Sequence, residues 1–152
     1  MNNPLCATSS LSSLRWASLL LAWLAAVAST LGALFFSEVM GLEPCVLCWY
    51  QRIAMFPLVV VLGLGVYRQD INSAVYALPL AAAGWLAAGY HWLVYSGFVP
   101  KDLQPCGTGP SCAEVDLRLA GFLTIPLMSL LAFSLIIILL AAASKRRGPA
   151  HS

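Results

Sequence analysis

Four long apolar segments occupy most of this chain of 152 residues and leave little sequence between them. They cover about residues 14–36, 48–67, 74–95 and 120–143, and each reaches the roughly 20 mostly apolar residues that a membrane-crossing helix needs. Hydrophobic residues make up 61% of the sequence and charged residues only 9%, well below the roughly 25% of soluble domains. No segment alternates with the period of two that membrane β-barrels require. The pattern predicts an all-α membrane protein: a single domain of four antiparallel transmembrane helices.

The first segment also has one feature of a cleaved signal peptide. The run Ala26-Val27-Ala28 resembles a cleavage site. The apolar stretch, however, exceeds the ~7–15 residues of a signal core and continues past that site. Its length favours an uncleaved helix, and cleavage would leave the direction of the second segment unchanged.

Basic residues predict the orientation of the segments. Arg15, Arg68 and the run 145–147 lie beside one set of segment ends, and few basic residues lie on the other side. Because positive residues mark the cytoplasmic side, we expect both termini in the cytoplasm and the longest loop, about residues 96–119, outside. We therefore expect a multi-pass protein of a bacterial inner (cytoplasmic) membrane. The net charge of +2 gives no reason to expect a nucleic-acid partner.

Four of the five cysteines form two close pairs, both on the predicted outer, periplasmic side, where disulfides persist. Cys45 and Cys48 form a C-x-x-C motif at a helix start, where free N–H groups and the helix dipole favour a reactive thiolate. Cys106 and Cys112 lie in the loop, with two glycines and a proline between them that let the pair close. Such an exposed disulfide suits exchange, although it could also be a structural staple. Cys6 is predicted on the reducing side, as an incidental thiol.

Two polar residues are predicted at about the depth of the C-x-x-C motif. Arg52 lies one helical turn beyond Cys48, and a charge within a membrane segment indicates a functional site by default. We expect it to hold negative charge on the Cys48 thiolate or on a cofactor, the alternative being a side chain that merely reaches back to the headgroups. His91, near the outer end of the third segment, is either part of an interfacial aromatic belt or a hydrogen-bonding partner of a cofactor.

Two chemical roles are open to the cysteine pairs. Structural zinc sites use short C-x₂₋₄-C spacings in both halves, and the loop pair is spaced more widely, so we expect no metal. Two dithiols on one face of a membrane protein instead indicate electrons passed between disulfides. The alternative is a non-catalytic membrane module with a metal-bound or disulfide-stapled outer loop.

Several stretches resemble the disulfide bond formation protein B (DsbB) family. Its signature is resembled by residues 44–52, PCVLCWYQR. The start of its fourth helix is resembled by residues 112–114, CAE, and 121–127, GFLTIPL. With four segments and two outer cysteine pairs, the resemblance covers nearly the whole chain. The close spacing of Cys106 and Cys112 is similar to the branch found in Gram-positive bacteria and some others.

The resemblance implies a thiol oxidase that reoxidises a periplasmic thioredoxin-like carrier (DsbA) and passes the electrons to a membrane quinone, ubiquinone or menaquinone. It implies that the carrier attacks Cys106, that Cys112 is the loop partner, and that electrons then pass to the C-x-x-C pair. Cys48 would contact the quinone as a thiolate. Arg52 would stabilise the anionic charge, and His91 is a candidate second contact.

Overall fold

The computed structural model describes residues 4–100 and 124–144, with side-chain burial from residue 12 onward. Within these residues the chain is helical and contains no strand, which confirms the all-α prediction. The elements in chain order are α1 (Pro4–Leu34), a single π-helical turn η1 (Phe35–Val39), α2 (Val46–Tyr67), α3 (Ser73–Tyr95) and α4 (Ile125–Ser144).

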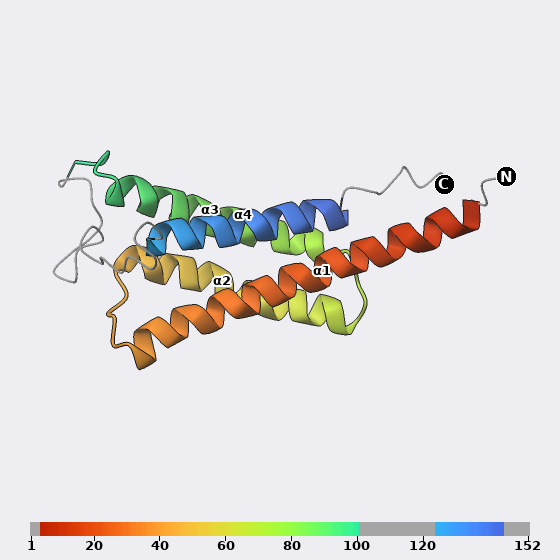
Figure 1. Ribbon diagram of the computed structural model, residues 1–152, viewed down its shortest axis with the longest axis horizontal. Coiled ribbons are helices and arrows are strands. Elements are labelled where there is room, and N and C mark those ends of the chain that lie inside the picture. The colour runs from red at the N-terminus through yellow and green to blue at the C-terminus, as the bar shows by residue number, and fades with distance from the viewer. Residues whose placement is uncertain (1–3, 101–123, 145–152) are drawn as a thin grey trace.

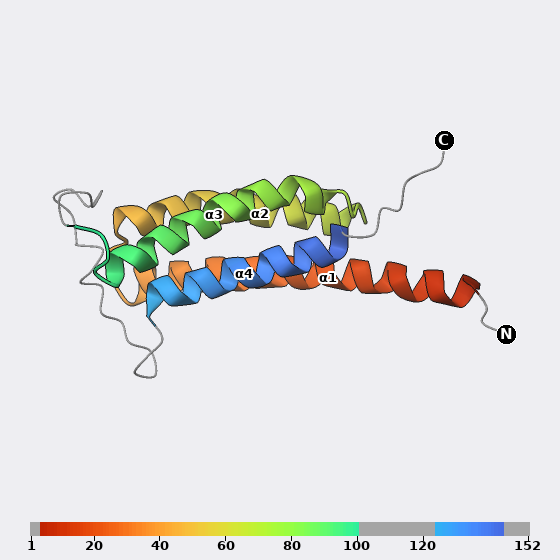
Figure 2. The ribbon, with the colours of Figure 1, turned by 90° about the horizontal axis from the view of Figure 1, so that it is seen from above.

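The four α-helices pack as an antiparallel bundle of two layers. Figure 2 shows α2 and α3 forming one layer and α1 and α4 the other. Each helix contacts two neighbours, so that α1–α2, α2–α3, α3–α4 and α1–α4 close a ring. The start of α1 and the end of α4 lie at one end of the bundle, and α1 projects beyond the other helices there (Figure 1). This arrangement puts the end of α1, the start of α2 and the start of α4 together at the opposite end.

Among the described residues, three helical stretches are long and apolar enough to cross a membrane: Ser12–Val39, Val46–Tyr67 and Ile125–Ser144. The helix α3 has similar length, and its three tyrosines, two tryptophans, two glycines and one histidine lower its hydropathy. It nevertheless packs between α2 and α4 as a full member of the bundle. Four crossings with cytoplasmic termini therefore stay a prediction.

Both ends of α1 differ from the predicted segment of residues 14–36. The helix α1 begins at Pro4, well before residue 14, because polar serines end an apolar run without ending a helix, and proline is tolerated in a first turn. Its far end continues past residue 36 into η1, where the hydrogen bonds lengthen to an i→i+5 pattern, as in Met40 N–H to the Phe35 carbonyl (3.2 Å). Turns of this kind are frequent at functional sites.

The core depends on small residues of α3. The buried face of α3 includes Ala77, Ala81, Gly84 and Ala88. A Cβ added at Gly84 would overlap the ring of Phe133 on α4, so the two backbones approach closely at this point. The large fully buried side chains around this contact are apolar: Leu19, Leu58, Leu62, Ile136 and Leu140.

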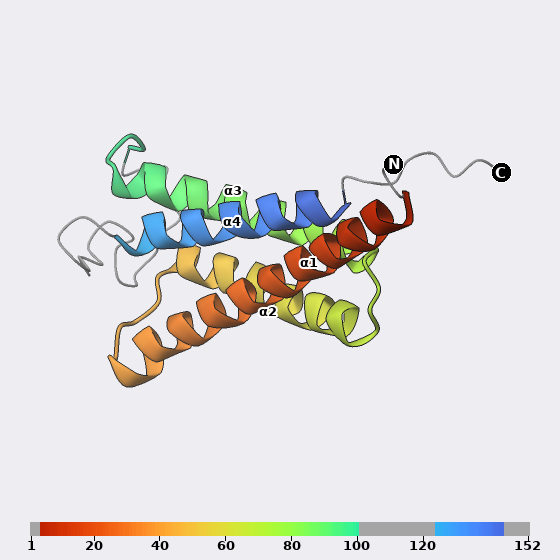
Figure 3. The same ribbon diagram turned by 45° about the vertical axis from the view of Figure 1, so that its right-hand side comes forward.

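Polar contacts tie the helices together at the end of the bundle that holds the start of α1. The Arg15 Nε donates to the Ala143 carbonyl oxygen (2.9 Å), joining α1 to the last turn of α4. The turn between α2 and α3 closes through Ser73, whose hydroxyl donates to the Asp70 carbonyl (2.7 Å). At the opposite end α1 and α2 splay apart, as Figure 3 shows, and the candidate site lies there.

Candidate active site

The C-x-x-C motif lies at the first turn of α2. Cys45 is the N-cap residue, with an extended backbone (φ −67°, ψ 167°), and Cys48 is in the first turn. Because an N-cap side chain projects toward the third helical residue, the two sulfurs approach to 3.1 Å as free thiols. Cys45 is buried, with 1% of its surface exposed, whereas Cys48 is partly exposed. The motif is thus a dithiol already positioned for disulfide formation.

Cys45, just outside the apolar span of α2, has an environment that favours the thiolate. The hydrogen bond with Cys48 lowers the pKa of Cys45 well below the usual range of a cysteine. Burial opposes this shift, and a weaker hydrogen bond from His91 supports it. A cysteine ionised in this way is the reactive form in disulfide exchange.

A buried chain of polar groups extends from Cys45 into the bundle. The His91 Nε2 lies 3.7 Å from the Cys45 sulfur, and the His91 Nδ1 lies 3.1 Å from the side-chain nitrogen of Gln51. Both side chains are buried, His91 with 1% and Gln51 with 7% of their surface exposed. In this arrangement the Gln51 amide donates to Nδ1, so the ring proton is on Nε2 and points to the sulfur.

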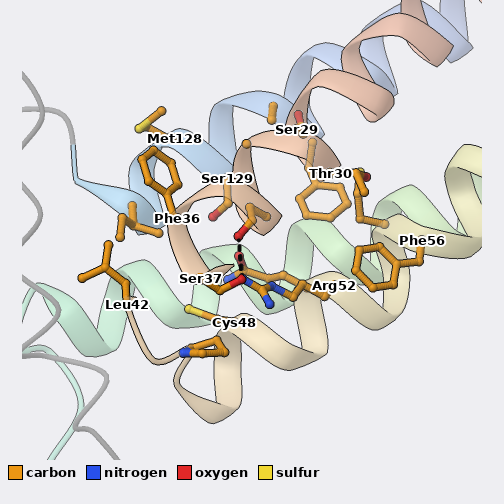
Figure 4. A pocket seen from close by; sticks show the side chains of 18 of the residues that line it. Ser29, Thr30, Phe36, Ser37, Leu42, Cys48, Arg52, Phe56, Met128 and Ser129 are labelled. Atoms are coloured by element: carbon orange, nitrogen blue, oxygen red, sulfur yellow. Dashed lines mark hydrogen bonds between the residues drawn. The ribbon is translucent and has the colours of Figure 1, made fainter. Parts of the chain in front are cut away.

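A cavity of about 400 Å³ opens beside Cys48, between α1, α2 and α4. Figure 4 shows Cys48 and Arg52 side by side on α2, with Ser37 and Ser129 contributed by the neighbouring helices. Its wall is mostly apolar, a composition typical of small-molecule sites. The lining residues with polar or ionisable side chains are Ser29, Thr30, Ser37, Glu43, Cys48, Gln51, Arg52 and Ser129.

The Arg52 side chain links α2 to α1 at the end of the bundle where these helices splay apart. Its Nη2 donates to the Ala33 carbonyl oxygen (2.7 Å), and its guanidinium lies 5.5 Å from the centre of the Trp49 ring. Ala33 is one residue from the end of α1, where η1 begins. Within the described part of the chain no carboxylate is close enough to form an ion pair with Arg52, and it lines the same cavity as Cys48. Its positive charge is available to an anion or to a polarised oxygen in that cavity.

The structure brings the predicted site residues of α2 and α3 together at one end of the bundle. They do not all face the same surroundings. Cys48 and Arg52 line the cavity, whereas Cys45 and His91 lie behind Cys48 and do not. His91 contacts Cys45 and Gln51 instead of facing the cavity, a neighbourhood that the sequence did not indicate. The loop pair, predicted within residues 96–119, falls outside the described residues, and nothing is described of the side chain of Cys6.

Sequence reasoning missed two parts of the site. The first is the wall that α1 and α4 contribute, including Ser37 and Ser129. The second is the pairing of Gln51 with His91, which are 40 residues apart. The only sequence signal for that pairing is a polar residue on an apolar helix next to Arg52, and its partner is decided by packing.

The chain is similar to proteins of one family along nearly its whole length. The profile of the family "Disulfide bond formation protein DsbB" matches residues 15–143. A "Probable disulfide formation protein" of Metapseudomonas resinovorans is 48% identical over 139 residues, which cover 91% of this chain and 96% of the relative.

Relatives from other bacteria agree with that match. A "Probable disulfide formation protein C 2" of Bacillus anthracis is 46% identical over 120 residues, covering 79% of this chain and 85% of the relative. An "SPbeta prophage-derived disulfide bond formation protein B" of Bacillus subtilis (strain 168) is 40% identical, covering 70% of this chain and 72% of the relative. No solved structure matches the chain significantly.

Proposed function

The chain belongs to the DsbB family of disulfide bond formation proteins, and from this premise we propose that it is a quinone-dependent thiol oxidase. It is a multi-pass membrane protein of disulfide bond formation. In the proposed reaction, a thioredoxin-like dithiol carrier of the DsbA type is oxidised to its disulfide. The two electrons and two protons that this releases pass through the two cysteine pairs to a membrane quinone, ubiquinone or menaquinone.

The observation that carries the proposal is that one sulfur of the dithiol and an arginine with no acidic partner among the described residues border one mostly apolar cavity. Cys48 lines that cavity directly, and Arg52 lies one turn away on the same helix. The lining fits a quinone: apolar walls accept a ring, and the Arg52 guanidinium offers N–H donors to a ring oxygen. A quinone bound there supplies an acceptor for two electrons and two protons.

The residues around the cavity have different roles in the proposed transfer of electrons. Cys45, away from the cavity, is stabilised as a thiolate by Cys48 and His91 and is the sulfur suited to exchange with another cysteine. Cys48 presents its sulfur to the cavity and is the sulfur suited to pass electrons there. Arg52 stabilises negative charge on that side. Cys106 and Cys112 form the pair that meets the carrier, with Cys106 as the sulfur attacked.

Redox potentials explain why an acceptor beyond the cysteines is needed. Strongly oxidising carriers of the DsbA type lie at about −120 mV, whereas ordinary dithiols lie at about −180 to −270 mV. Passing electrons from such a carrier to an ordinary dithiol alone runs uphill by about 60 mV or more, roughly 3 kcal/mol for two electrons. A quinone of higher potential makes the overall transfer favourable.

The proposal is tested with purified protein, a reduced DsbA-type carrier and a soluble quinone. We expect catalytic loss of carrier thiols with one quinone reduced per disulfide formed, and quinone in an organic extract of the purified protein. Cys48→Ser should abolish turnover, and the matched variant Cys6→Ser should retain it. Undiminished thiol loss in Cys48→Ser would show that electrons do not follow this route.

The proposed function includes a place and an orientation: a bacterial inner membrane, with the cysteine pairs on the periplasmic face. The distribution of Arg15, Arg68 and the run 145–147 supports it. In intact cells, a membrane-impermeant maleimide should label reduced Cys106 or Cys112 and leave Cys6 unlabelled. If Cys6 were labelled and the loop pair were not, the orientation would be opposite to the proposed one.

A further inference from the structure

A third group that could bind a metal ion lies beside the dithiol, and a different helix supplies it. The Cys45 sulfur, the Cys48 sulfur and a ring nitrogen of His91 all lie within 4.8 Å of one another. Closeness of the two sulfurs is what any disulfide pair requires. An imidazole nitrogen 3.7 Å from the Cys45 sulfur, buried and fixed from behind by Gln51, is not needed to form a disulfide.

The separations suit a tetrahedral metal ion. With Zn–S bonds of about 2.3 Å and Zn–N bonds of about 2.0–2.1 Å, neighbouring ligand atoms of a tetrahedral zinc site lie roughly 3.5–3.8 Å apart. The distance of 3.7 Å between the Cys45 sulfur and the His91 Nε2 already falls in this range. The two sulfurs, at 3.1 Å, must separate by about two thirds of an ångström, which a small rotation of the partly exposed Cys48 side chain supplies.

We propose that the reduced protein binds one Zn²⁺ through Cys45, Cys48 and His91, with the fourth position open toward the cavity. Two thiolates and a neutral imidazole around Zn²⁺ form an uncharged unit, which avoids leaving isolated charges in the buried site. Binding displaces the thiol protons and transfers no electrons. The disulfide form has no thiolate ligands, so zinc binding is confined to the reduced state.

Gln51 acts as the positioning residue of this site. Zinc needs the lone pair of His91 Nε2, so the ring proton must be on Nδ1, where Gln51 must then accept it. A side-chain amide donates through its nitrogen and accepts through its oxygen, so a half-turn of the Gln51 amide serves both states of His91. Gln51 also lines the cavity, which leaves room for that rotation.

The consequence is a reversible block of the dithiol. While zinc holds both sulfurs, they cannot form a disulfide with each other or with another cysteine. Access is through the cavity that Cys48 and Arg52 line. Zinc in the outer compartment would therefore arrest the reduced protein until a chelator or a competing ligand removes the ion.

The test measures zinc binding to the full chain with neither quinone nor carrier present. Cys6, Cys106 and Cys112 are replaced by serine, so that only the C-x-x-C thiols remain. The protein is reduced with a phosphine, freed of reductant without oxygen, and titrated with Zn²⁺ against a chromophoric chelator. We expect one Zn²⁺ per reduced chain and none after the same sample is oxidised to the disulfide. Co²⁺ in place of zinc should give the visible spectrum of a tetrahedral site with sulfur ligands.

Variants separate this site from a simple dithiol. His91→Ala should weaken zinc binding more than 100-fold and change the Co²⁺ spectrum. Gln51→Leu should weaken binding about 10- to 100-fold, the usual effect of removing a partner behind a ligand. Gln51→Glu, whose carboxylate accepts the Nδ1 proton, should bind zinc at least as tightly as the parent.

A measurement without substitution at the ligands guards against a variant that does not fold. In protein with ¹⁵N-labelled histidine, zinc should shift the ring-nitrogen NMR signals of His91 but not those of His151 in the reduced chain. The proposal is overturned if His91→Ala binds zinc as tightly as the parent, if zinc leaves the His91 signals unchanged, or if the reduced chain binds no zinc. None of these results bears on thiol oxidation, and a protein inactive with quinone can still bind zinc, so the two proposals fail separately.

Discussion

The guanidinium of Arg52 donates a hydrogen bond of 2.7 Å to the main-chain carbonyl oxygen of Ala33, which links α2 to the last turn of α1. The contact lies where α1 passes into the π-helical turn η1 (Phe35–Val39). It fixes a positive charge beside Cys48 in the wall of the cavity. The irregular end of α1 therefore helps to position the Arg52 side chain on α2.

Replacing Arg52 by alanine should weaken the use of quinone more than it weakens the fold. A hydrogen bond from a charged group contributes about 1.5–3 kcal/mol, so the apparent affinity for a soluble quinone should fall about 10- to 100-fold. Steady-state thiol oxidation at varied quinone concentration measures this, and thermal unfolding in detergent measures the fold.

The matched control is Arg68→Ala, the same substitution at the other end of the same helix. It should leave the quinone dependence unchanged because Arg68 follows the last turn of α2, away from the cavity. Arg52→Lys should give an intermediate result, since lysine keeps the charge but lacks the planar fork of donors. An unchanged quinone affinity in Arg52→Ala would remove Arg52 from the proposed role.

A larger side chain on α1 that fills the cavity should also weaken the use of quinone, although no charge is removed. Gly32 lines the cavity, and a Cβ added there meets no atom within 4 Å. Gly32→Leu should therefore raise the KM for quinone roughly tenfold or more, about 1.4 kcal/mol, with little change in unfolding temperature. The result is read from the same kinetic and thermal measurements.

Gly84→Leu is the contrasting substitution. A side chain there would overlap the Phe133 ring in the packed face between α3 and α4, and overpacking of this kind costs about 1–3 kcal/mol or more. We expect a clear fall in unfolding temperature. If Gly32→Leu instead destabilised the protein as much as Gly84→Leu, the space beside Gly32 would not be an open cavity in solution.

The two thiols of the helix motif should differ in their reaction with a small apolar maleimide. Cys48 lines the cavity, whereas Cys45 has 1% of its surface exposed. In the reduced protein, with the other three cysteines replaced by serine, peptide mass spectrometry should find Cys48 modified first. A quinone analogue should slow that modification. Faster labelling of Cys45 would mean that its ionisation outweighs its burial.

The turn between α2 and α3 offers a stabilising substitution. Gln69 has φ +54°, a left-handed conformation that glycine adopts without strain, in a helix ending closed by Gln69 N–H to the Val66 carbonyl and Asp70 N–H to the Gly65 carbonyl. Gln69→Gly should stabilise the protein by about 0.5–1 kcal/mol, seen as a higher unfolding temperature. Gln69→Ala, which keeps the strain, should give no gain. A loss of stability in Gln69→Gly would show that the glutamine side chain contributes more than the strain costs.

Much of the helical content of this protein is predictable from local sequence. The runs that become α2 and α3 are recognisable because apolar length and helix-breaking links depend on neighbouring residues alone. The end of α1 is different: nothing in the run Phe35–Val39 predicts a π-helical turn, whose stability depends on what packs against it. The cavity has the same origin, since its walls combine α1 and α2 with α4, which is distant from them in sequence.

The sequence by itself determined the family, the helical membrane character and the close spacing of Cys45 and Cys48, because these depend on composition and on a motif within one turn of α2. Only the tertiary structure decided which sulfur faces the cavity and which faces His91. The physical reason is that a helix start fixes the spacing of Cys45 and Cys48, but the neighbouring helices fix their surroundings. α1 and α4 leave space beside Cys48, and α3 places a buried imidazole against Cys45.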